Sequence, residues 1–156
     1  MKRNRRGSKK EQQTIQVWTY EQATRALPYV ASIIRSLRED ALEIQRFSVE
    51  AERLAKLPGR PTRDQLIDRE EALRAAREAS DRFDETLAEL HILDIYSLDP
   101  LRGQALIPFA QSDQLAWYVY DLFDEKPLRF WRYHEDPLET RRSVSEPGVQ
   151  GTSSAV

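Results

Sequence analysis

Apolar residues recur at alternating spacings of three and four along two long stretches of the chain, which is typical of one face of an α-helix. The first set comprises Leu27, Val30, Ile34, Leu37, Ala41, Ile44, Ser48, Ala51 and Ala55. The second set comprises Leu66, Arg69, Leu73, Ala76, Ser80, Phe83, Leu87 and Leu90. The segment Leu57–Pro61 between them contains Gly and Pro and favours a turn. The pattern therefore predicts an antiparallel helical hairpin.

Capping residues indicate where these helices begin. Thr19 followed by Gln22, and Thr62 followed by Gln65, both have the spacing of a capping box. A short helix is expected from the first box through Ala26, and Pro28 either kinks it or opens a new helix. The run from Ile15 to Trp18, just before the first box, is β-like.

A different pattern, with a period of two residues, dominates the aromatic-rich part of the chain. Ala105, Ile107 and Phe109 alternate with other residues as in a strand, and Pro108 predicts an edge or a bulge there. Residues 115–123 form the strongest predicted strand, 124–127 a turn, and 128–133 the return strand, with Leu128 and Phe130 on the face opposite Trp131 and Tyr133. Short connections imply antiparallel pairing. The fold class is therefore α+β, with a long antiparallel helical hairpin on a three- to four-stranded antiparallel sheet.

Length and charge set the domain organisation. A chain of 156 residues predicts one domain. Residues 1–10 hold six Lys or Arg and no acid, which leaves the rest of the chain acidic. We expect a basic disordered tail over 1–13, an ordered domain over 14–142 and a second tail over 143–156. No apolar run is long enough for a membrane helix, and the absence of cysteine excludes disulfides and thiolate chemistry.

Three motifs resemble the bacterial family called domain of unknown function 2203. The segment WTYEQATRALPYV resembles its Thr-x-x-x-Ala-x-x-x-Leu-Pro start, and DPLRGQALIPF resembles its Gly-containing turn and strand. The segment LAWYVYDLFDEKPLRFWRYHEDPLETRR resembles its paired strands, although the family's Trp-His pair is Trp131-Arg132 here, with His134 two residues further on. The resemblance spans about residues 15–142. It implies a fold but no activity, because the family carries no established activity.

Polar residues at the exit of the last predicted strand are the main candidates for chemistry. Histidine beside carboxylates can bind a metal or move protons, and Arg beside aromatic rings can hold a phosphate or carboxylate. The alternative is that these side chains form ordinary ion pairs with one another at a solvated strand end, and we expect this alternative over a metal or anion site. The turn from Asp99 to Gly103 is a second candidate. The full set of candidates is Asp99, Gly103, Arg132, His134, Asp136 and Arg142.

Two functions follow as expectations. The first is a non-enzymatic protein-interaction or scaffold module of the bacterial cytoplasm, acting through the hairpin or an exposed sheet face. The second is a small-ligand or metal-binding protein, with or without catalytic activity, with its site around His134, Asp136 and Arg142. No phosphate loop or hydrolase motif predicts a cofactor. We expect an unidentified protein partner or a homodimer, no membrane association, and at most weak contact of the basic tail with nucleic acid.

Overall fold

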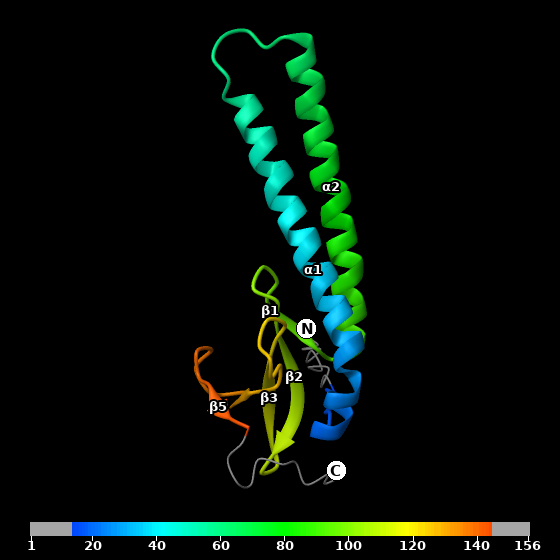
Figure 1. Cartoon of the computed structure of the whole chain (residues 1–156), viewed down its shortest axis with the longest axis vertical. Helices are drawn as coiled ribbons and strands as arrows, with labels where there is room; N and C mark the ends of the chain where they lie inside the picture. The colour runs from blue at the N-terminus through cyan, green and yellow to red at the C-terminus, as the bar shows by residue number, and fades with distance from the viewer. Residues whose placement is uncertain (1–13, 145–156) are drawn as a thin grey trace, which may run out of the picture.

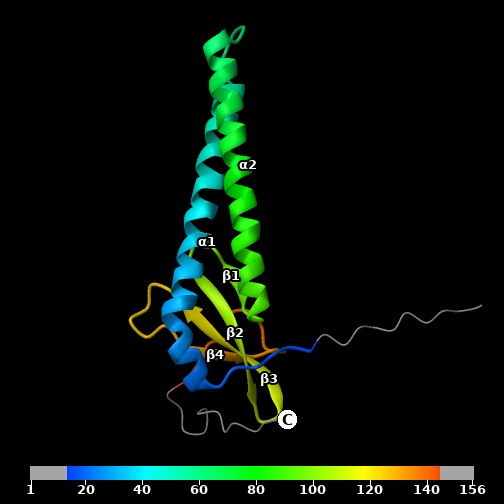
Figure 2. The same cartoon turned by 90° about the vertical axis from the view of Figure 1, so that its right-hand side faces the viewer.

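Two long helices and a five-stranded antiparallel sheet make up residues 14–144, the part of the chain that the computed structural model describes. The helices are α1 (Tyr20–Ala55) and α2 (Arg63–Ile92). The strands are β1 (Tyr96–Asp99), β2 (Gln104–Gln111), β3 (Gln114–Asp121), β4 (Phe130–Tyr133) and β5 (Arg142–Ser143), and they lie in the sheet in chain order. The predicted α+β class is confirmed, with five strands in place of three or four. Figures 1 and 2 show the hairpin standing away from the sheet, which lies against its base.

Both helices begin with the capping boxes that the sequence predicts. Thr19 Oγ1 accepts a hydrogen bond from the backbone N–H of Gln22 at 3.1 Å, and Thr62 Oγ1 accepts one from Gln65 at 3.2 Å. Pro28 lies inside α1 and does not divide it. The expected short helix ending at Ala26 is therefore the first part of a 36-residue helix, because packing of the flanking turns outweighs the one hydrogen bond that proline cannot donate.

The line of contact between the helices differs by one residue from the predicted seam in the distal half of the hairpin. On α1 the predicted Ala51 is buried, but Phe47 and Leu54 are half-buried where the predicted Ser48 and Ala55 are exposed. On α2 the predicted Leu90 is buried at the base, but further along the helix Ala72 and Ala79 are buried in place of their predicted neighbours Leu73 and Ser80. Both helices carry apolar residues on adjacent positions of a wide stripe, so the sequence period alone does not determine which column faces the partner.

The hydrophobic core lies between the base of the hairpin and one face of the sheet. Register places Ile107, Tyr118 and Trp131 side by side on this face. The Phe109 ring stacks on Tyr118 with centroids 4.0 Å apart and meets Trp131 edge-on at 5.7 Å. From the helices, the core receives Ala23, Val30, Ile33, Ile34, Leu37 and Leu90. The period-two alternation of the aromatic segment therefore serves packing.

The segment before α1 is extended but is not a strand, contrary to the β-like interpretation of residues 15–18. A single backbone hydrogen bond joins it to the sheet, from Trp18 N–H to the carbonyl of Pro108 at 2.8 Å. The Trp18 indole donates to the carbonyl of Leu93 at 3.0 Å and anchors the segment beside the end of α2. Pro108 lies on the part of β2 that β1 does not reach, so its predicted edge position is confirmed.

The last strands also depart from prediction. Leu128 lies in the loop before β4 and enters the core with Trp131, although strand alternation assigned it to the opposite face. Ser143 pairs with Phe130 in β5, and Val144 packs against the core. The described structure therefore extends two residues past the predicted domain end at 142. The predicted basic tail over 1–13 and the rest of the predicted C-terminal tail, 145–156, lie outside the described residues.

Candidate functional site

Asp136 and Arg142, the centre of the predicted polar site, bind each other. Arg142 donates from Nε and Nη2 to the two carboxylate oxygens of Asp136 at 2.9 and 3.0 Å. The backbone N–H of Tyr133 donates to the same carboxylate at 2.9 Å. The Arg142 hydrogen bonds, followed by that of the Tyr133 N–H, hold the pKa of Asp136 below its ordinary value. The Arg142 guanidinium also lies over the rings of Trp131 and Tyr133, at 5.4 and 4.9 Å from their centroids.

Arg132 is the buried charge of this region, with only 5% of its surface exposed. It lies opposite Trp117 in the sheet, on the face away from the helices. Its Nη1 donates to the carbonyls of Tyr133 and Asp136 at 3.1 and 2.7 Å, which holds the turn after β4 against the sheet. Its Nε is buried and has no hydrogen-bond partner among residues 14–144. The visible contacts of Arg132 are thus with the backbone of its own turn.

His134 is exposed on the surface beside Trp117. The Trp117 indole N–H donates to His134 Nδ1 at 3.0 Å, so Nδ1 is the unprotonated nitrogen and the ring is oriented by a donor. Trp117 also meets the ring of Tyr96 edge-on at 5.6 Å, and Tyr96 contacts His91 at 5.1 Å. These rings join the end of α2 to the outer face of the sheet through side-chain packing.

The second candidate, the turn from Asp99 to Gly103, lies at the opposite end of the strands. Gln104 pairs with Asp121, whereas the backbone N–H of His134 reaches Leu115. Leu115 and Asp121 are six positions apart along β3, a distance of about 20 Å. Gly103 has φ of +66°, and a Cβ there would lie 2.8 Å from Leu122 Cβ, so glycine is required for backbone reasons.

The fold therefore brings His134, Asp136, Arg132 and Arg142 together and leaves Asp99 and Gly103 apart from them. Asp99 accepts a hydrogen bond from the Arg102 backbone N–H at 3.2 Å and stabilises its own turn. No group of three or more His, Asp or Glu side chains with a geometry fit to hold a metal ion occurs among residues 14–144. The observed contacts of the predicted polar site are those of a strand exit closed by ion pairing.

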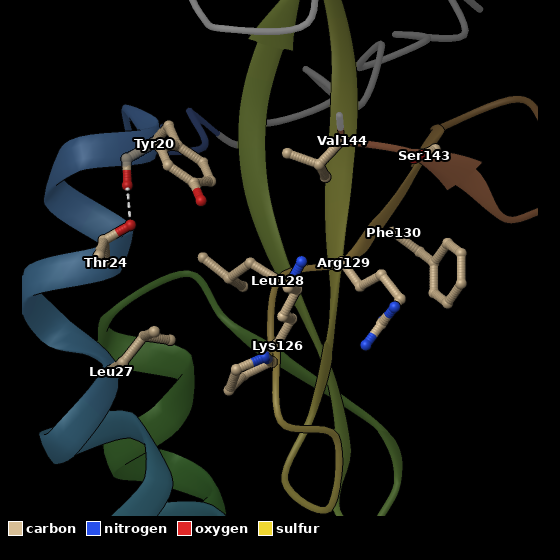
Figure 3. A pocket seen from close by; sticks show the side chains of 10 residues that line it. Tyr20, Thr24, Leu27, Lys126, Leu128, Arg129, Phe130, Ser143 and Val144 are labelled. Carbon is tan, nitrogen blue, oxygen red and sulfur yellow. Dashed lines mark hydrogen bonds between the residues drawn. The ribbon is translucent and has the colours of Figure 1, made fainter. Parts of the chain in front are cut away.

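A cleft that the sequence did not reveal lies between α1 and the sheet's last strands. It has a volume of about 630 Å³ and is lined from α1, the loop before β4, and β5. Its lining residues are Tyr20, Thr24, Leu27, Lys126, Pro127, Leu128, Arg129, Phe130, Ser143 and Val144. In Figure 3, Thr24 and Leu27 on α1 face the loop that carries Lys126 and Leu128. Segments about 100 residues apart in sequence form the walls, so no local motif marks the cleft.

A buried phenol lies next to one wall of this cleft. Tyr118 is fully buried, and the edge of its ring approaches Tyr20 with centroids 5.9 Å apart. Burial, together with the neighbouring Tyr20, raises the pKa of Tyr118 to about 12. Its hydroxyl has no hydrogen-bond partner in the described part of the chain. Tyr118 itself does not line the cleft, whereas Tyr20, which its ring meets, does.

Comparison of the chain with protein-family models, with curated proteins and with solved structures finds no match. Within residues 14–144, neither helix has the length and apolarity to cross a membrane. Function is therefore argued from the molecule's own surfaces.

Proposed function

We propose that this protein is a non-enzymatic interaction module of the bacterial cytoplasm that binds a partner through the distal half of its helical hairpin. The observation that carries the proposal is the exposure of large apolar side chains on that half. Leu42 and Val49 on α1 are 40% and 58% exposed, and Leu66 and Ile67 on α2 are 48% and 44% exposed. Such residues on a projecting element favour a contact surface.

The interior of the distal hairpin supports the same proposal. Between Leu42 and the turn, the fully buried residue of α1 is Ala51, and its counterparts on α2 are Ala72 and Ala79. Alanine allows close approach of the helices but buries little apolar area, and burial stabilises by about 25 cal/mol per Å². With 36 residues at about 1.5 Å each, α1 spans about 54 Å. A hairpin of that length with so small a core gains stability when further helices pack on it.

Ion pairs fix the hairpin on one flank. Arg82 on α2 donates to Asp40 at 3.3 Å and to Glu43 at 2.5 Å, both on α1. Helical periodicity places Arg82 on one flank of the contact line and Leu66 and Leu73 on the opposite flank. The partner we propose presents an apolar face to the exposed side chains of this distal half, either as a helix of another protein or as a second copy of this chain.

Site-specific photo-crosslinking in the native cells tests the proposal. A benzoylphenylalanine residue is placed at Val49 or Leu66 in the full chain, and at Leu138 as a matched control that is 59% exposed but lies outside the hairpin. We expect a discrete cross-linked species from each of the two hairpin positions. This species should disappear when the photo-crosslinker is at one position and the other carries Glu. Equal yields of the same species from Leu138 would contradict the proposal.

A second copy of this chain is the first candidate partner to test. Sedimentation equilibrium of the purified full chain should show a dimer at micromolar concentration if a second copy is the partner, and Val49→Glu should shift it to monomer. A monomer at all concentrations assigns the cross-linked species to a different protein.

The metal-binding alternative gains no support, since Asp136 and Arg142 are engaged with each other. The family resemblance stays a prediction.

A further inference from the structure

We infer that the cleft between the first turns of α1 and the last strands is a binding site for a small amphipathic anion, with a flat or short apolar body and one carboxylate or sulfonate group. The inference is independent of the hairpin surface. It rests on the cleft's size, the composition of its walls and the charges at its rim.

Size and walls fit a small molecule. The volume of about 630 Å³ lies within the range of ligand pockets in proteins. Leu27 from α1 and Leu128 and Val144 from the opposite wall give apolar surface on two sides. Apolar walls of this kind favour the body of a ligand over a hydrated ion.

The charges at the rim are of one sign. Lys126 and Arg129 both line the cleft, and no lining residue is acidic. Arg129 is held by Asp124, to which it donates twice at 2.9 Å. Lys126 forms no ion pair within 4 Å of a carboxylate among residues 14–144, although its charge, after the hydrogen bonds from Arg129 and from its own backbone N–H, also helps to lower the pKa of Asp124. The cleft therefore offers one ammonium group beside apolar walls, which suits one anionic group on the ligand.

A pair of fluorescent probes that differ by one charge tests the inference. The probes are 8-anilinonaphthalene-1-sulfonate and its uncharged counterpart N-phenyl-1-naphthylamine, each titrated against the full chain. Three variants are compared with the unaltered chain. Thr24→Trp fills the cleft from an exposed helix position, Lys126→Glu reverses the rim charge, and Arg60→Glu makes the same change of net charge in the distal turn. Circular dichroism checks that each variant is folded.

We expect saturable one-to-one binding of both probes, weakened at least tenfold by Thr24→Trp. Lys126→Glu should weaken the sulfonate probe about fivefold to tenfold and leave the uncharged probe within about twofold, and added salt should reduce that difference. Arg60→Glu should leave both affinities within about twofold. The inference is overturned if neither probe saturates at up to about 1 mM, or if Thr24→Trp leaves both affinities unchanged. Equal weakening of both probes by Lys126→Glu overturns the assignment of an anionic ligand.

Discussion

The base and the distal half of the hairpin are built from the same two helices but are stabilised differently. At the base, Ile34 and Leu37 of α1 pack with the aromatic face of the sheet, where Tyr118 and Phe109 stack. In the distal half, the buried positions are alanines, Phe47 and Leu54 are only half-buried, and four large apolar side chains are exposed. A regular helical pattern in the sequence thus accompanies a large core in one region and a small one in the other. The free energy of unfolding should be concentrated at the base.

The largest test of this comparison removes side-chain volume from each region. Leu37→Ala at the base should lower the free energy of unfolding by about 3 kcal/mol, because the side chain is 1% exposed and its loss leaves a cavity. Val49→Ala in the distal half should change it by less than about 0.5 kcal/mol. Urea unfolding followed by circular dichroism measures both. Equal losses would mean that the distal half holds a core comparable to that of the base.

A pair of glycine substitutions gives the next largest difference. Gly103→Ala should cost about 2 to 3 kcal/mol, since it combines a positive φ with a Cβ placed against Leu122. Gly59 in the distal turn has φ of +85°, but nothing lies within 4 Å of an added Cβ. Gly59→Ala should therefore cost about 1 kcal/mol. Thermal unfolding of the two variants measures the difference. A cost at Gly59 equal to that at Gly103 would show that the clash with Leu122 is relieved by movement.

The two capping boxes have nearly the same geometry and allow a matched comparison. Thr19→Ala at the base should lower global stability by about 1 kcal/mol. Thr62→Ala at the distal end should have a smaller global effect and mainly speed hydrogen exchange in the first turn of α2, because that turn can open without disturbing the core. Hydrogen exchange read by mass spectrometry separates the two responses. If Thr62→Ala lowers global stability as much as Thr19→Ala does, the first turn of α2 does not open independently of the core.

The smallest expected effect concerns the Asp136–Arg142 pair, because exposed ion pairs contribute little. Since folding lowers the pKa of Asp136 from its ordinary value of 3.8, the pair stabilises the protein above about pH 4 and this contribution is lost as the pH falls further. Asp136→Asn should therefore be less stable than the unaltered chain at pH 7, and the difference should shrink between pH 4 and about pH 2. Urea unfolding at several pH values measures it. A constant difference would assign the effect to shape rather than charge.

Much of the local structure was predictable from short-range patterns. Thr19 and Thr62 begin the helices because a hydroxyl three residues before a glutamine satisfies the free backbone N–H groups of the first turn. The strands around Phe109 and Tyr118 follow from alternation that matches the pleat. The predicted polar site was found together at the end of β4, because its members are close in sequence.

Other features of the fold and of the polar site could not be predicted from local sequence patterns. Two adjacent apolar columns on each helix left the contact line ambiguous, and the larger Phe47 and Leu54 took positions next to the predicted ones. The β-like segment ending at Trp18 failed to become a strand because only the Pro108 carbonyl receives a backbone hydrogen bond from it. The interactions that close the polar site depend on the direction in which Arg142 returns in β5.

The sequence alone thus determined which segments are helical, where the helices begin and which residues alternate in the strands, because these features depend on neighbours within a few residues. Tertiary structure decided which apolar column faces inward, that Arg142 closes on Asp136, and that Lys126 meets α1 across a cleft. Those outcomes depend on segments up to about 100 residues apart, whose approach is fixed by packing of the whole core and not by local pattern.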